Sequence, residues 1–233
     1  PNGHPREART IVPPMTTHIP LPIAGSDDEY PPPADWVLSD DFNMPITRQT
    51  QRRNDTVQSA FEVRVARDGR DASILANVPL RWNGAHKTIG VDPDVMWVEP
   101  ALPKGMRSVL TWKPGVSPPR LAVEIVSRAT AYKDYVRGPD KYAASGTREL
   151  WVFDPEGYGR TEDERGPWVL QVWRRTRDTF RCVYRGDGPF RSKELGSWIV
   201  FLGDLLRVAD DEAATALWPT AHELAQHERE RAE

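Results

Sequence analysis

Two carboxylates in the sequence interrupt otherwise apolar stretches of chain. Asp94 lies within Val91–Val95, and Glu124 lies within Leu121–Val126. A lone carboxylate in apolar surroundings is costly unless it meets a cation, a cluster of donors or a metal ion. Two carboxylates that converge from neighbouring strand ends can hold a hard divalent cation such as Mg²⁺. From the residues alone, the alternative is that each one pairs with an arginine or caps a loop.

The chain around these carboxylates has the pattern of β-strands. Leu121–Val126 is nearly all apolar, as in a strand that is buried on both faces of a sheet. Ile74–Trp82 and Thr88–Val98 are strand-like and joined around Asn83-Gly84, which predicts a hairpin. Further strands, two of them forming a second hairpin, are predicted at Trp151–Asp154, Trp168–Arg174, Thr179–Tyr184 and Trp198–Leu206.

A first helix is predicted upstream of the strands. It begins at Thr47 or Thr50, presents Val57 and Phe61 on one face, and ends within residues 67–70.

A second helix is predicted between the two buried strands, over Asp134–Ala144. Gly138-Pro139 interrupts or starts it, and Gly146 sits where a C-terminal glycine belongs. Asp134 is either a distal site residue or a charge favoured by the helix dipole, and we prefer the second interpretation. Together these elements predict an α/β fold with a mixed sheet.

The composition narrows the class of protein. With 233 residues, 39% of them hydrophobic, the chain can bury a continuous core. The single cysteine, Cys182, cannot pair within the chain, so a reducing cytoplasm is the expected location. Apolar runs fall far short of the roughly 20 residues that cross a bilayer, so we expect no membrane partner. The formal net charge of -3 argues against a general polyanion-binding surface, and contact with nucleic acid would be local.

Three regions are expected along the chain. Residues 1–35 hold nine of the 22 prolines and few spaced apolar residues, which predicts a flexible Pro-rich arm. Residues 36–209 are expected to form the α/β domain. Residues 210–233 are expected to form a charged C-terminal helix or tail.

An ordered series of residues runs through the two carboxylate segments and beyond them. Its members are Pro93-Asp94-Val95, Pro119-Arg120-Leu121 to Glu124, Ser127, Asp134, Tyr142, Gly146, and Glu149-Leu150-Trp151 to Asp154-Pro155. This series resembles the Uma-type restriction endonuclease family of bacteria, a branch of the PD-(D/E)XK nuclease superfamily. The resemblance is strong from about Val78 to Pro155. It implies a restriction-endonuclease-like core, with helices flanking a mixed central β-sheet and with additional β-hairpins.

The resemblance implies a Mg²⁺-dependent endonuclease that hydrolyses DNA phosphodiester bonds by metal-activated water, with Mn²⁺ as a possible substitute. Asp94 and Glu124 would bind the metal with the backbone carbonyl of Val126. By analogy with the superfamily, the protein is expected to be a homodimer.

The catalytic lysine of this pattern is displaced. The superfamily places it two residues after the acidic residue, where this chain has Val126, and the Uma-type pattern places it four residues before the tyrosine, where this chain has Gly138. Lys141 is the nearest candidate, three residues further along on roughly the same helical face. Arg137 and Lys133 are alternatives.

The missing lysine keeps other functions open. A catalytically degenerate nuclease-fold module could bind nucleic acid or a protein partner without cleavage, and a structural domain could use the two carboxylates only in ion pairs. A basic rim near the carboxylates would favour contact with phosphates, and its predicted members are Arg120, Arg128, Lys133, Arg137 and Lys141.

Overall fold

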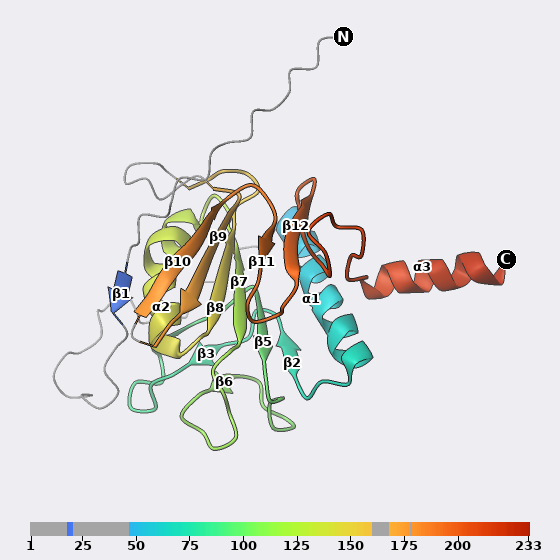
Figure 1. The fold of residues 1–233 in the computed structure, drawn as a ribbon. Coiled ribbons are helices and arrows are strands. Elements are labelled where there is room, and N and C mark those ends of the chain that lie inside the picture. The colour runs from blue at the N-terminus through green and yellow to red at the C-terminus, as the bar shows by residue number, and fades with distance from the viewer. Residues whose placement is uncertain (1–17, 21–46, 160–167, 178) are drawn as a thin grey trace, which may run out of the picture.

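The computed structural model describes residues 18–20, 47–159, 168–177 and 179–233. The predicted Pro-rich arm lies outside the described residues, except for strand β1 (His18–Pro20). A seven-stranded mixed sheet of order β1-β10-β9-β8-β7-β5-β2 forms the centre of the fold, which confirms the predicted α/β class (Figure 1). Its other strands are β2 (Ser73–Leu75), β5 (Val95–Val98), β7 (Leu121–Ile125), β8 (Glu149–Phe153), β9 (Leu170–Arg175) and β10 (Thr179–Gly186).

Two small sheets flank the central one. The first has the order β11-β12-β13 and the second has the order β4-β3-β6. Their strands are β3 (Leu80–Arg81), β4 (Gly90–Val91), β6 (Val109–Leu110), β11 (Phe190–Arg191), β12 (Trp198–Leu202) and β13 (Leu205–Ala209).

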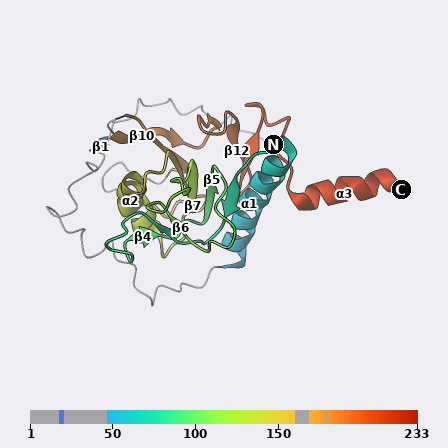
Figure 2. The same cartoon turned by 90° about the horizontal axis from the view of Figure 1, so that it is seen from below.

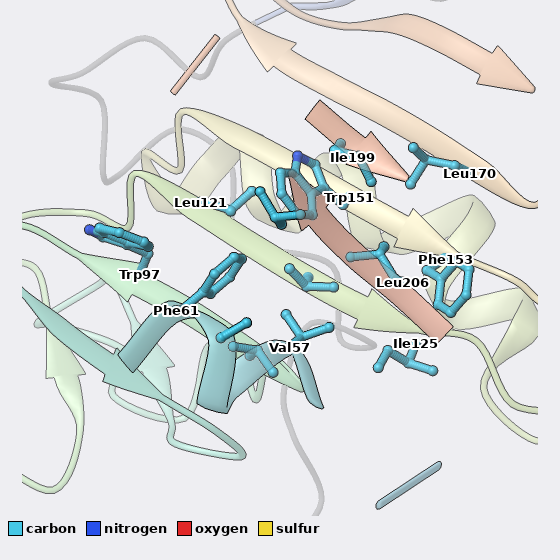
Figure 3. Packing of buried hydrophobic residues seen from close by; sticks show 14 of the residues in the cluster. Val57, Phe61, Trp97, Leu121, Ile125, Trp151, Phe153, Leu170, Ile199 and Leu206 are labelled. Carbon is cyan, nitrogen blue, oxygen red and sulfur yellow. The ribbon is translucent and has the colours of Figure 1, made fainter. Parts of the chain in front are cut away.

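Helix α1 (Arg48–Asp68) forms where the sequence predicts it. The Thr47 side chain caps its first turn by accepting a hydrogen bond from the amide of Thr50 at 3.1 Å. Gly69, with φ of 61°, ends it in the left-handed conformation that glycine adopts without strain. Phe61 packs edge-on against Trp97, with ring centroids 5.5 Å apart, and anchors the helix to one face of the sheet (Figure 3).

The opposite face is covered by the connection between the two parallel strands. β7 and β8 run parallel, so the chain must cross over between them. It does so through a π-helical turn, η2 (Lys133–Arg137), and helix α2 (Gly138–Ser145). Helices α1 and α2 lie on opposite sides of β5 and β7 (Figure 2). Gly146, with φ of 87°, ends α2 as expected.

The predicted first hairpin, Ile74–Trp82 with Thr88–Val98, is split between two sheets. β2 pairs with β5 in the central sheet, whereas β3 pairs with β4 in a small one. Pro79 and Pro93 lie at the two breaks. Because proline cannot donate to a ladder, neither strand continues through as one piece. The second predicted hairpin forms between β9 and β10.

The C-terminal segment is helical over a shorter range than the sequence suggests. Helix α3 spans Ala221–Ala232 and begins with a capping box between Thr220 and Glu223. Residues 210–216 form turns and bends instead, in which the Asp211 carboxylate accepts the amides of Thr215 and Ala216, and Leu217 forms a β-bridge with Ala209. Helix α3 has no buried residue and extends away from the body (Figure 1). Within the described ranges, no helix is long and apolar enough to cross a membrane.

Candidate active site

Asp94 and Glu124 are brought together by the register of two antiparallel strands. β5 and β7 pair with Val95 opposite Val123, so the next position along the ladder sets Asp94 opposite Glu124. Residues that face each other in an antiparallel pair project from the same face of the sheet. The two carboxyl groups are close enough for each to affect the pKa of the other. The structure therefore unites the two acids on the face of the sheet that α2 covers.

The Asp94 carboxylate is held by donors from two other elements. The amide of Ile125 donates to its Oδ2 atom at 2.7 Å, and the Asn54 side chain donates through Nδ2 to its Oδ1 atom at 3.3 Å. Burial raises the pKa of Asp94 above its ordinary value, although both donors and the nearby Lys133 oppose this shift.

Glu124 is almost fully buried, with 3% of its surface exposed. Its Oε1 atom accepts a hydrogen bond from the Tyr142 hydroxyl at 2.6 Å and lies 3.8 Å from the Lys133 Nζ atom. Burial raises the pKa of Glu124 well above its ordinary value. Lys133 opposes that shift, whereas the negative charges of Asp134 and Asp94 add to it.

Asp134 is a third carboxylate in the same cluster. It is 1% exposed, and its Oδ1 atom lies 3.1 Å from Lys133 Nζ. Burial raises the pKa of Asp134 to about 6, with Lys133 acting in the opposite direction. Asp134 does lie in the first turn of η2, as its interpretation as a charge at a helix end expects, but its buried side chain also turns inward beside Lys133.

Lys133 is the cation that joins these acids. Burial disfavours its charge, but the carboxylates of Glu124, Asp134 and Asp94 outweigh that cost and raise its pKa. About a third of its side chain, 35%, stays exposed. The cluster thus combines three carboxyl groups with one lysine that also reaches solvent.

Comparison with known proteins places this chain within a family. A family model described as "Putative restriction endonuclease", Uma2, matches residues 42–161, which is more than half of the chain. The chain belongs to the Uma2 family. The match spans Asp94, Glu124 and Tyr142, and it confirms the resemblance expected from the ordered series of residues. A search of curated proteins finds no match.

A solved structure is also similar to this Uma2 chain. It is described as "a putative nuclease belonging to DUF820 from Anabaena variabilis ATCC 29413". The two share 15% sequence identity, and the alignment covers 66% of this chain and 76% of the other, with a TM-score of 0.40.

The π-helical turn explains how Lys133 reaches the site. The amide of Gly138 donates to the carbonyl of Lys133, five residues earlier rather than four. The extra residue sets Lys133 above Gly138, and Tyr142 follows one α-helical turn later. Lys133 and Tyr142 therefore contact the same oxygen of Glu124. Gly138, where the resemblance in sequence led us to expect the lysine, lies between them without a side chain.

Lys141 and Val126, the other two residues of the predicted site, are both buried. Lys141 directly precedes Tyr142 in α2 and is 5% exposed. The Val126 amide donates to the carbonyl of Phe153 at 2.8 Å, which fixes the backbone just beyond β7. The catalytic role of Lys141 and the role of the Val126 carbonyl as a ligand stay predictions.

The predicted basic rim is only partly present. Arg120 lies at the other end of β7, where its guanidinium binds Glu99 at 2.6 Å and Glu194 at 3.2 Å. It is therefore a structural residue that cannot face the site. Arg137 lies over the ring of Tyr132, 5.3 Å from its centroid.

Glu149 shows how a buried acid outside the site is satisfied. It is fully buried, but Arg174 pairs with it at 2.9 Å and the Trp151 indole donates to it at 2.9 Å. The basic partner of Glu149 is therefore Arg174, which lies opposite it on the neighbouring strand β9. Glu149 thus has an arginine of its own, whereas Glu124 and Asp134 both pair with the single Lys133.

Sequence reasoning missed the roles of Asn54 and Tyr142. Tyr142 is a member of the ordered series, but the series alone does not predict its hydrogen bond to Glu124. Asn54 lies on the face of α1 that carries Val57 and Phe61, and its side chain is fully buried. A polar residue at an apolar position of an amphipathic helix was the available signal.

Proposed function

We propose that this Uma2 protein is a divalent-metal-dependent endonuclease that hydrolyses DNA phosphodiester bonds, with Asp94 and Glu124 as the metal ligands. The observation that carries the proposal is the convergence of these two carboxylates beside Lys133 Nζ, 3.8 Å from Glu124. Membership of a restriction endonuclease family supports a nuclease. To this the proposal adds the divalent metal ion, DNA as the substrate, and the residues that bind the metal.

The donor set fits a hard divalent cation. Three carboxyl groups share one lysine, and burial raises the pKa of Asp94, Glu124 and Asp134. Burial is the main cause of each raised pKa, and for Glu124 and Asp134 the charges of neighbouring carboxylates add to it, so a cation placed among these groups would favour their ionised forms. In the parts of the chain that are described, no group of three or more His, Cys, Asp or Glu is arranged to hold a metal ion. Mg²⁺ suits a site with only two carboxylate ligands, Asp94 and Glu124, because it is commonly bound by one or two carboxylates and keeps several waters.

Each residue of the site has a separate part in the proposal. Mg²⁺, with Mn²⁺ as a substitute, would lower the pKa of a water molecule and offset charge on the phosphate. Asp94, Glu124 and the Val126 carbonyl would hold the ion. The Lys133 ammonium, partly open to solvent, can hydrogen bond a phosphate oxygen or orient the attacking water.

Lys133 answers the main objection to catalysis. The degenerate-module alternative rests on Gly138, where the lysine is missing. An ammonium group nevertheless reaches Glu124 from Lys133, one turn earlier. We therefore favour cleavage over binding alone and assign Lys133 as the electrostatic helper, with Lys141 as the competing residue.

The wider organisation belongs to the same proposal. We propose one nuclease domain over residues 36–209, with residues 1–35 and 210–233 as appendages, in a cytoplasmic homodimer. Light scattering of the purified protein measures the oligomeric state, and limited proteolysis followed by mass spectrometry maps the domain limits.

The test of the proposal uses two neighbouring aspartates. Asp94→Asn removes a proposed ligand, whereas Asp92→Asn changes an acid that is 48% exposed and paired with Arg81 outside the cluster. Nicking of supercoiled plasmid with Mg²⁺ or Mn²⁺ is measured for both variants and the native protein. The proposal requires Asp94→Asn alone to lose activity. DNA binding without nicking by the native protein would instead support the degenerate module.

A further inference from the structure

Asn54 presents an unexplained polar atom to the proposed metal site. Its side chain is fully buried on the sheet-facing side of α1. The amide nitrogen donates to Asp94 Oδ1 at 3.3 Å. The amide oxygen, Oδ1, is buried and has no hydrogen-bond partner among the residues that the structure describes.

The orientation of this amide follows from its neighbour. Asp94 Oδ1 is an acceptor when the carboxyl group is ionised, so the Asn54 nitrogen rather than the oxygen must face it. Oδ1 and Nδ2 are bonded to the same carbon, which keeps the unpartnered oxygen beside Asp94. A buried acceptor without a partner loses the hydrogen bonds that water gives it in the unfolded chain, so this position of the oxygen is unfavourable unless a ligand meets it.

Unsatisfied acceptors gather at this one place. In the described part of the chain, the buried side-chain oxygens without a hydrogen-bond partner are Asn54 Oδ1 and Asp134 Oδ1. Asp134 Oδ1 still has the Lys133 ammonium at 3.1 Å. Among the described residues, Asn54 Oδ1 has no such partner. A cation between Asp94 and Glu124 would be a suitable partner for it, because amide oxygens are good ligands of hard divalent ions.

We propose that Asn54 supplies a neutral oxygen ligand, Oδ1, to the divalent cation held by Asp94 and Glu124, directly or through one bound water. The proposal rests on the function proposed above. In this arrangement, Nδ2 orients the Asp94 carboxylate while Oδ1 meets the ion. Helix α1 would thus contribute to the site together with β7 and the turn before β5.

Calorimetric titration of Mn²⁺ into the full chain tests this assignment without relying on cleavage. Asn54→Leu removes both amide functions at similar volume, and Asn54→Asp keeps an oxygen in place but loses the N–H donor. We expect Asn54→Leu to weaken Mn²⁺ binding about tenfold or more. Asn54→Asp is expected to bind Mn²⁺ at least as tightly as the native protein.

The outcomes separate the possible roles of Asn54. Native affinity in Asn54→Leu would overturn the proposal, because Oδ1 would then be idle. Equal weakening in both variants would also overturn it, because the N–H donor would then carry the effect through Asp94. If Asn54→Leu shows no cooperative unfolding transition in urea, the titration is made with Asn54→Ala, which removes the same oxygen.

Glu124→Gln distinguishes this inference from the proposed function. A native protein that binds Mn²⁺ no better than Glu124→Gln would refute the metal site itself. Loss of binding in Glu124→Gln together with native binding in Asn54→Leu would refute only the role of Asn54.

Discussion

Lys133 Nζ lies 3.8 Å from Glu124 Oε1, the same oxygen that the Tyr142 hydroxyl contacts at 2.6 Å. One oxygen of a buried carboxylate thus faces both a cation and a neutral donor. Burial raises the pKa of Glu124, and the negative charges of Asp134 and Asp94 add to that shift. Lys133 is therefore the group that most directly favours the ionised form of Glu124.

We predict that Lys133→Met lowers the nicking rate by about 100-fold or more, the usual effect of losing a proton-transfer or water-orienting group. Lys141→Met is the matched control, because it changes a lysine of the same helical connection that is also mostly buried. It should keep most of the activity. Single-turnover nicking rates provide the measurement. A large loss in Lys141→Met with a small loss in Lys133→Met would make Lys141 the helper.

Asp134 is predicted to destabilise the metal-free protein at neutral pH. Its pKa is about 6 in the folded state against an ordinary 3.8, so the folded state binds the proton more tightly. Its stabilising contribution is complete below pH 3.8 and is lost as the pH rises to about 6. Asp134→Asn should raise the free energy of unfolding at pH 7.5 by up to about 3 kcal/mol, with little change at pH 4. Urea unfolding at the two pH values tests this, and equal effects at both would contradict it.

Metal affinity is predicted to rise with pH. Burial raises the pKa of both proposed ligands, Asp94 and Glu124, so protons compete with the metal ion above the usual carboxylate range. Mn²⁺ should bind more tightly at pH 8.5 than at pH 5.5, and the rise in melting temperature on adding Mn²⁺ should grow in parallel. An affinity for Mn²⁺ that does not change between pH 5.5 and pH 8.5 would contradict the raised pKa values of Asp94 and Glu124.

Tyr142→Phe is predicted to shift the pH dependence of cleavage. Removing the hydroxyl deprives the ionised Glu124 of a 2.6 Å hydrogen bond, so the pKa of Glu124 should rise further. The acidic limb of the pH–rate profile should then move to higher pH. Tyr135→Phe is the control, because that buried hydroxyl donates to Asp154 instead, at 2.9 Å. Equal shifts in both variants would point to a general loss of packing.

Local signals made much of the fold predictable. Thr47 and Gly69 delimit α1 because capping depends on a few adjacent residues. The apolar run around Glu124 predicted a buried strand, because a strand that is covered on both faces has apolar residues at almost every position. The split of the first hairpin was harder to predict, because two prolines redirect each half to a different sheet.

The site was only partly predictable. Asp94 and Glu124 could be paired because each interrupts an apolar strand-like stretch. The contact of Lys133 could not be located, because a π-helical turn adds a residue that the 3.6-residue period does not register. The apolar face of α1 marks Asn54 as an unusual polar residue, but it does not identify the partner, Asp94, which is 40 positions away in sequence.

Nicking of supercoiled plasmid DNA by the native protein and by Glu124→Ala, prepared side by side and assayed with Mg²⁺ or Mn²⁺, is the most direct test of metal-dependent cleavage at this site. We predict metal-dependent nicking by the native protein and its loss, by about 100-fold or more, in Glu124→Ala. Equal nicking by the two proteins would contradict the assignment, because cleavage would then arise from another site or from a contaminant.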